Sequence, residues 1–268
     1  MANEGCIIYP SSGFYFEDDV TYNVAFNAET NLGSHSYDFF DTGISNQRLL
    51  VPTGFSGNAQ VWGYMATTDI GADDAYWGII SNNQSYTYPI QRDAGNMTRG
   101  QTTGVIDVDD TWYFMNRVRT FGSSHPTAYR RTHLAILLDP QPIAAAQGYK
   151  NNYEANGLTY MTGATEEFDY NGIFNPTTGE FTAPSGAHSV ALYANGWSDF
   201  NGTEHAVRWH KNGTEIVRSR YDPASRSPVV PSFGLWECSP GDVFEYVVDR
   251  GVAGVYMYDT RFSAVFYG

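Results

Sequence analysis

Short stretches in which apolar and polar residues alternate occupy almost the whole chain. They are rich in aromatic and β-branched residues and end at Gly, Asn, Asp or Pro, a pattern typical of half-buried β-strands bounded by turns. In the first half, the pattern predicts strands at residues 20–26, 49–51, 60–65, 76–80, 104–108, 112–118 and 133–138. In the second half, it predicts strands at residues 180–182, 189–194, 205–210, 214–219, 233–237, 243–248, 254–258 and 261–267. So many short strands in each half predict a sandwich or a barrel.

The layout of the first half recurs in the second half without the same letters. Residues 49–52 align with 181–184 (181 − 49 = 132), 82–83 with 212–213 (212 − 82 = 130), and 132–138 with 260–266 (260 − 132 = 128). A nearly constant shift over such landmarks indicates two copies of one β module.

The proline-rich segment 139–142 marks the boundary between the two copies, because proline cannot donate a hydrogen bond to a sheet ladder. The one helix-friendly run, residues 143–147, falls inside this linker. We predict an N-terminal arm at residues 1–17, module 1 at 18–138, a linker at 139–155 and module 2 at 156–268. The arm is either an extended segment that a partner holds in place or a frayed terminus.

Composition supports an all-β chain of about two domains. Aromatic residues make up 16% of the 268 residues, and charged residues also only 16%. Tyr and Phe suit a half-buried pleated surface. The formal net charge of −14 opposes binding to phosphate backbones and anionic lipid, so we expect neither nucleic acid nor a membrane as a partner.

The N-terminal sequence has neither a basic start nor an apolar run of signal-peptide length, and no stretch approaches the roughly 20 apolar residues of a membrane span. We therefore expect synthesis in a host cytoplasm without a signal peptide. The only cysteines, Cys6 and Cys238, lie in different parts of the chain and do not make a disulfide framework. Cys238 is expected to be a small buried apolar residue.

Three turn signals have clear physical explanations. Pro176 presets the backbone of one tight turn, and Gly179 supplies a positive φ at its end. Asn212-Gly213 between alternating residues predicts a type I′ hairpin. Residues 240–242, Pro-Gly-Asp, predict another turn before a strand.

These stretches resemble the complement globular-head and tumour-necrosis-factor-like jelly-roll family. The similar stretches are residues 174–186, 209–213, 238–244 and 261–267, in the family's order, within about residues 168–268. Weaker counterparts in the first copy are residues 38–41, 48–54, 109–112 and 132–138. The resemblance implies a ten-stranded jelly roll without catalytic function that packs into compact trimers through aromatic faces. With the repeat, it predicts two tandem jelly-roll β-sandwich domains.

No motif for catalysis or for binding a cofactor stands out. Metalloprotease, serine-hydrolase, phosphate-loop and Cys-x-x-Cys patterns are absent from the sequence. His205 and His210 are five residues apart, which places them on opposite faces of a strand. We therefore predict no enzyme, no catalytic residue and no cofactor.

One acidic cluster is a weak candidate for calcium. Asp107, Asp109 and Asp110 offer hard oxygen ligands at short spacing, although the Gly and Glu of an EF-hand loop are missing. The alternative is that these carboxylates are solvated turn residues.

Four aromatic residues at loop positions are candidates for stacking on sugar rings: Tyr86, Tyr88, Trp197 and Phe200. The alternative is ordinary packing at a rim or in a core.

The setting that best suits these features is a virus particle. The chain is acidic and has only Lys150 and Lys211 as lysines, which leaves long stretches of Asn, Thr, Ser and Gly on the expected surface. We expect a non-enzymatic virion protein, a homotrimeric capsid decoration, head fibre or spike that contacts other virion proteins such as the major capsid protein. The alternative is a module of a phage tail fibre that binds a host-surface glycan or receptor.

Overall fold

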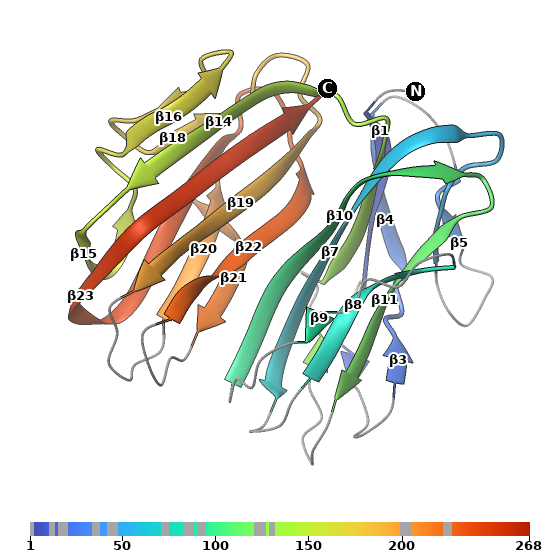
Figure 1. Ribbon diagram of the computed structural model, residues 1–268, viewed down its shortest axis with the longest axis horizontal. Coiled ribbons are helices and arrows are strands. Elements are labelled where there is room, and N and C mark those ends of the chain that lie inside the picture. The colour runs from blue at the N-terminus through green and yellow to red at the C-terminus, as the bar shows by residue number, and fades with distance from the viewer. Residues whose placement is uncertain are drawn as a thin grey trace. The chain divides into compact units, whose positions relative to one another are not determined.

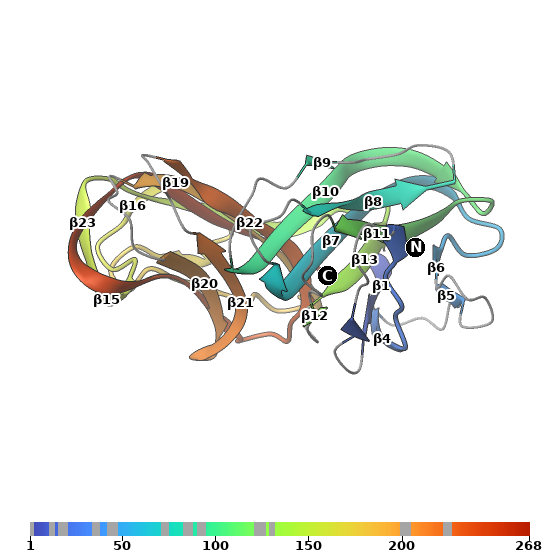
Figure 2. The ribbon, with the colours of Figure 1, turned by 90° about the horizontal axis from the view of Figure 1, so that it is seen from below.

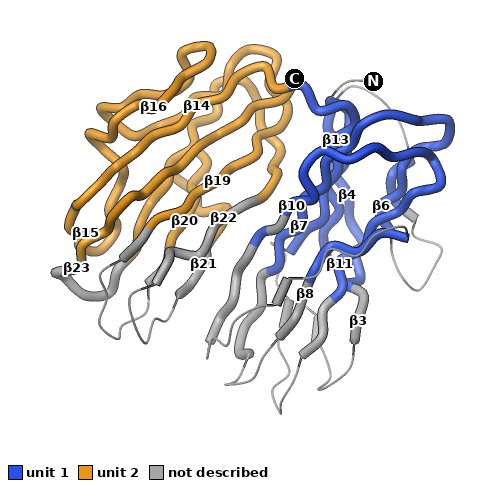
Figure 3. The backbone as a smooth tube through the Cα atoms, viewed as in Figure 1, with its two compact units in different colours: residues 1–141 blue, residues 142–268 orange. Residues whose placement is uncertain are grey.

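The computed structural model describes residues 3–10, 14–15, 21–33, 38–41, 48–70, 75–82, 88–89, 95–120, 127–128, 132–198, 205–221 and 227–268 (Figure 1). The described residues form strands and turns, and no helix among them is long and apolar enough to cross a membrane. The chain divides into two compact units, residues 1–141 and residues 142–268 (Figure 3). The predicted all-β class is confirmed.

Unit 1 is a sandwich of two sheets. Its strands are β1 (Glu4–Tyr9), β2 (Phe14–Tyr15), β3 (Thr21–Asn23), β4 (Ala28–Leu32), β5 (Phe40–Asp41), β6 (Arg48–Leu50), β7 (Ser56–Ile70), β8 (Ala75–Ser81), β9 (Tyr88–Pro89), β10 (Gly95–Asp109), β11 (Tyr113–Thr120), β12 (Thr127–Ala128) and β13 (His133–Leu138). One sheet has the order β2-β12-β7-β13-β1-β4, with β10 also paired to β7. The other has the order β5-β6-β11-β8-β9, with β3 also paired to β11. Sequence neighbours that lie in different sheets, such as β6 and β7, give the crossed connections of a jelly roll.

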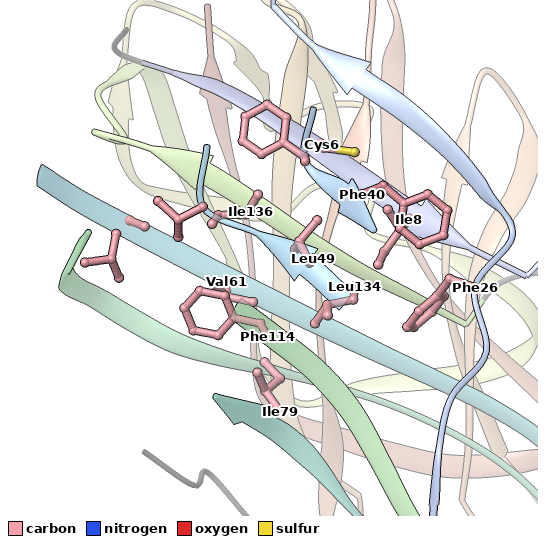
Figure 4. Close-up of a cluster of buried hydrophobic side chains, with 14 of the residues drawn as sticks. Cys6, Ile8, Phe26, Phe40, Leu49, Val61, Ile79, Phe114, Leu134 and Ile136 are labelled. Atoms are coloured by element: carbon pink, nitrogen blue, oxygen red, sulfur yellow. The ribbon is translucent and has the colours of Figure 1, made fainter. Parts of the chain in front are cut away.

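The core of unit 1 lies between these sheets (Figure 4). Val61, Leu134 and Ile136 project from one sheet, and Leu49 and Phe114 project from the other. All five side chains are fully buried. Each large apolar side chain buried in this way contributes about 1.5–3 kcal/mol to folding, so this layer supplies much of the stability of the unit.

Strand β13 is buried at all six positions, His133–Leu138. Leu134, Ile136 and Leu138 enter the core, and alternation places Ala135 and Leu137 on the opposite face. A strand that is apolar on both faces is typical of an inner layer that is covered on each side.

Unit 2 is built from strands that form one continuous ten-stranded sheet folded into two layers. They are β14 (Pro142–Lys150), β15 (Tyr153–Tyr160), β16 (Thr165–Tyr170), β17 (Phe174–Asn175), β18 (Glu180–Thr182), β19 (Ser189–Ser198), β20 (His205–Lys211), β21 (Thr214–Tyr221), β22 (Ser227–Glu237) and β23 (Val243–Tyr267). The end of β23 pairs with β14 and β19, and its beginning pairs with β18, β15 and β20. Figure 2 shows β23 bending from one layer to the other with β15 alongside it. The long strand β23 thus belongs to both layers, as expected for a jelly-roll sandwich.

An aromatic cluster fills the space between the two layers of unit 2. Phe181 lies 4.7 Å from Phe174 and 5.8 Å from Phe262, between ring centroids, and the second pair meets edge to face at 82°. Trp209 and Tyr246 adjoin this group with centroids 5.4 Å apart. Tilted and edge-to-face pairs of this kind add about 0.5–1.5 kcal/mol each beyond area burial.

The predicted turns are confirmed. Asn212 and Gly213 both have positive φ, 51° and 75°, as a type I′ hairpin between β20 and β21 requires. Gly179 has a φ of 81°, and a Cβ at this position would lie 2.6 Å from the carbonyl oxygen of Met161. Glycine is therefore needed there for both conformation and space.

The same backbone hydrogen bonds recur in the two units. In unit 1, the amides of Leu50, Val51, Phe55 and Asn82 donate to the carbonyls of Phe39, Trp112, Pro52 and Tyr113. In unit 2, the amides of Thr182, Ala183, Ala187 and Asn212 donate to the carbonyls of Ile173, Asp242, Pro184 and Val243. The donors are separated by the shifts noted in the sequence (182 − 50 = 132 and 212 − 82 = 130).

Two predicted segments differ from the structure. The arm predicted at residues 1–17 contains β1, which lies inside a sheet between β13 and β4 and buries Cys6 and Ile8 completely. Apolar residues there fill the core of unit 1, so Glu4–Tyr9 is neither an arm nor a frayed end.

The linker predicted at residues 139–155 is mostly strand. The units divide between Gln141 and Pro142, and the helix-friendly run lies in β14, which pairs with β16 and β23. The small residues of β14 fit beneath aromatic rings, since a Cβ on Gly148 would lie 2.5 Å from the Phe262 ring. Pro142 is tolerated because it stands at the first position of the strand.

We predict that Ile8→Ala destabilises unit 1 by about 2–5 kcal/mol, because it leaves a cavity in a packed core. Urea unfolding followed by spectroscopic probes of each unit measures the change, with exposed Thr53→Ala as the control. A frayed N-terminal arm would instead give no change for Ile8→Ala.

Candidate functional site

The side chains of the four aromatic candidates for sugar stacking lie outside the described part of the structure. Tyr86 and Phe200 lie outside the described residues. Tyr88 pairs with Trp77 on β8, and Trp197 on β19 pairs with Pro228 and Tyr258, but only their backbone is described. Glycan contact through these side chains therefore stays a prediction.

The acidic calcium candidates stabilise a turn. The Asp109 carboxylate accepts hydrogen bonds from the Thr111 amide at 2.9 Å and from the Thr111 hydroxyl at 2.5 Å, and these bonds lower the pKa of Asp109. Asp110 accepts from the amide of Gly54 at 2.7 Å, and Asp107 is exposed on β10. Within the described ranges, no three His, Cys, Asp or Glu side chains gather closely enough to hold a metal ion. The structure thus does not assemble Asp107, Asp109 and Asp110 into a site.

A different surface gathers polar and aromatic side chains on the outer side of unit 2. We call it the His210 face and define it by Leu158, Tyr160, Glu180, Arg208, His210, Glu215, Arg218, Glu245 and Asp249. Its residues come from β15, β18, β23, β20 and β21. The inward side of the same strands carries Trp209, Tyr246 and Val217, which are fully buried.

Strand register arranges the His210 face in rows. Glu180 pairs with Glu245, Glu245 with His210, and His210 with Glu215, which makes one row across four strands. The next row contains Tyr160 and Arg208, which flank Val247, and continues to Arg218. Side chains directly opposite one another in such rows lie close enough to interact.

A network of ion pairs fixes the centre of this face. Glu215 Oε2 lies 2.8 Å from Arg208 Nη1 and 2.7 Å from Arg218 Nη2, and Arg208 also pairs with Asp249. Isolated surface pairs contribute little, but a network of half-buried groups holds its members in one geometry. Arg208 is therefore held in place on two sides.

His210 is the most unusual residue of the face. Its side chain points outward and yet is only 5% exposed, and the Tyr160 ring meets it edge-on at 6.1 Å. Neither ring nitrogen has a hydrogen-bond partner among the described residues. Burial lowers the pKa of His210; the charge of Glu215 opposes this shift, and the charges of Arg208 and Arg218 add to it.

Two carboxylates face one another beside His210. Burial and the adjacent charge of Glu180 raise the pKa of Glu245 above its usual range. The Glu180 carboxylate accepts a hydrogen bond from the Thr178 hydroxyl at 2.8 Å. The row therefore holds a neutral imidazole next to paired acids, with acceptors available to a polar ligand.

Few features of the sequence indicate the His210 face. The predicted linker at residues 139–155 covers the start of β15, and the sequence pattern predicts no strand over Leu158 and Tyr160. The alternation Leu-Thr-Tyr at residues 158–160 is the one sequence feature that indicates a strand here. Strand β20 pairs with β23 without a register shift from His205 to Lys211, in keeping with the predicted alternation of His205 and His210.

Comparisons with known proteins show distant structural similarity only. No family model matches the chain, and no curated protein matches it. The globular domain of zebrafish complement 1qA protein is 15% identical and aligns with a TM-score of 0.38, over 46% of this chain and 95% of that domain. Paenibacillus xanthan lyase is 14% identical with a TM-score of 0.28, and this chain spans 25% of its length while 94% of this chain is covered. The PBSX exported protein XepA is 9% identical with a TM-score of 0.23, over 97% of this chain and 86% of that protein.

All three TM-scores lie below 0.5, so the jelly-roll assignment stands on strand order and register. No ligand or activity follows from these similarities.

We predict that acid weakens unit 2 through His210. Because the folded pKa of His210 lies below its unfolded value near 6.5, the unfolded chain binds the proton more readily below that pH. The stabilising contribution of His210 is therefore complete above about pH 6.5 and is lost as the pH falls through the folded pKa. Urea titrations at pH 7.5 and pH 5 should show a smaller loss of stability for His210→Phe than for the wild type. A folded imidazole pKa at or above 6.5, measured by NMR, would contradict this.

Proposed function

We propose that this chain is a non-enzymatic structural protein of a virus particle that assembles as a homotrimer and serves as a capsid decoration, head fibre or spike. The recurring hydrogen bonds and shifts support the further proposal that its two units are tandem copies of one jelly-roll module. No catalytic residue and no cofactor is part of this proposal. The acidic, lysine-poor composition supports a virion setting.

The observation that carries the assembly proposal is an exposed aromatic patch on unit 2. Phe168 and Tyr170 of β16 are 47% and 62% exposed. They pair with Gln147 and Ala145 of β14, and Ala145 pairs in turn with Val265 of β23. We call Phe168, Tyr170, Ala145 and Val265 the β16 patch.

The β16 patch lies on the outer side of its layer. Asp169, between its two aromatic residues, turns the other way and accepts hydrogen bonds from the Ile173 and Phe174 amides. The neighbouring Glu167 pairs with Arg261, so a charged rim borders the aromatic residues. An apolar centre with a polar rim is the usual composition of a subunit interface.

We expect the purified protein to have three times the chain mass by light scattering. Phe168→Asp combined with Tyr170→Asp should lower the mass to that of one chain, because burying two carboxylates in the interface is unfavourable. Tyr256→Asp, at another exposed aromatic residue, is the matched control and should leave the mass unchanged. Circular dichroism checks that each variant stays folded.

A monomeric wild type, or equal effects of the two changes, would contradict the trimer. The virion role is tested separately. Mass spectrometry of purified particles should find the chain, and added trimer should bind particles that lack it.

The alternative function is a receptor- or glycan-binding module of a phage tail fibre. The observation that favours it is the exposed Tyr160 ring beside the fixed Arg208, Glu215 and Arg218 groups. An aromatic ring next to rigid polar groups suits a sugar, which presents an apolar face and hydroxyls together.

If this alternative is right, Tyr160→Ala should abolish binding on a glycan array, while Tyr256→Ala should retain it. Loss of one aromatic anchor in a site weakens binding by roughly tenfold or more. Equal retention by both variants would remove the His210 face from consideration.

A further inference from the structure

We propose that Asn156 is a site of spontaneous deamidation in the folded protein. Asn156 precedes Gly157 in β15, and both residues are exposed. In this reaction, the Gly157 amide nitrogen loses its proton and attacks Asn156 Cγ, and ammonia leaves. Water then opens the resulting succinimide to aspartate or isoaspartate. The reaction needs only water, so the structure decides which Asn-Gly pairs can undergo it.

Asn156 itself lies at an interruption of the sheet ladder. Ala155 pairs with Val255 and Gly157 pairs with Arg250, so Asn156 falls at a register shift and has no residue opposite it. Gly157 has a φ of 61°, and nothing lies within 4 Å of where its Cβ would be. Asn156 is also exposed, so solvent, and not packed side chains, surrounds the pair.

Hydrogen bonding leaves the Asn156 side chain unrestrained. Only its backbone is held, since its amide donates to Thr159 Oγ1 at 3.0 Å and its carbonyl accepts from the same hydroxyl at 3.4 Å. The carboxamide itself makes no hydrogen bond to the described part of the protein. Formation of the succinimide ring requires the backbone at Asn156 to move, and the hydrogen bonds to Thr159 restrict that motion.

Other Asn-Gly pairs in the described ranges are restrained. The Asn212 carboxamide accepts from the Val243 amide at 2.9 Å and donates to Asp242 at 2.7 Å. The Asn171 carboxamide donates to the Ile143 carbonyl at 2.5 Å. At Asn195 each residue of the pair keeps one strand partner, because Asn195 pairs with Arg261 and Gly196 pairs with Val229, and Gly196 also packs on Thr260.

The modification would change one edge of unit 2. A carboxylate at residue 156 would add negative charge between Glu154 and the exposed Leu158. Isoaspartate would also lengthen the backbone by one methylene where β15 follows the bend of β23. This inference is independent of the proposed virion role.

The test compares sites within one sample. The folded wild-type protein is incubated at pH 8, and peptide mass spectrometry measures conversion at residues 156, 171, 195 and 212 over time. Conversion at Asn212 should be about tenfold slower than at Asn156, because its two hydrogen bonds must open first. In denaturant, the four sites should convert at similar rates.

Two variants sharpen the test. Thr159→Val should accelerate conversion at residue 156 alone, and Asn156→Gln should abolish it there. Conversion at Asn212 or Asn171 as fast as at Asn156 in the folded protein would overturn the proposal. The proposal would also be overturned if residue 156 converted no faster than residues 171 and 212.

Discussion

Pairing of the first strand of each unit with its last strand is the constraint on which the rest of the structure depends. In unit 1, β1 pairs with β13 in the register Cys6 to Ile136. In unit 2, β14 pairs with β23 in the register Ala146 to Ala264. Because a shift of one residue would turn every apolar side chain to the wrong face, these two registers determine which residues enter each core. They also place the boundary between the units after Gln141, since Pro142 is the first residue of β14, the strand that pairs with β23.

Sequence patterns predicted the features that depend on local chemistry. The Asn212-Gly213 hairpin and the Gly179 turn are decided by backbone conformations that few residues adopt, and both were predicted at the correct positions. The strands at 133–138 and 214–219 were predicted because each is a short run with apolar or β-branched residues bounded by turn residues. For these elements, neighbouring residues contain all the necessary information.

The strands that depend on distant partners were missed. The alanines of β14 favour a helix by propensity, but Ala144 and Ala146 are fully buried in the strand, and Gly148 of the same strand leaves room for the Phe262 and Phe174 rings. Likewise, β1 gives no signal that its partner lies about 130 residues away, in β13. The His210 face was missed for the same reason, since its rows exist only through the register of β15, β23, β20 and β21.

Strand β23 belongs to both layers of unit 2, and its two parts lie at two different outer surfaces. Its first part, near Val247, carries the His210 face, and its last part, near Val265, adjoins the β16 patch. The two surfaces lie on different layers of the sandwich, so a partner on one leaves the other open. A single strand nevertheless runs through both, and β15 follows its bend. The proposed subunit interface and the proposed ligand surface are therefore carried by the two parts of one continuous strand.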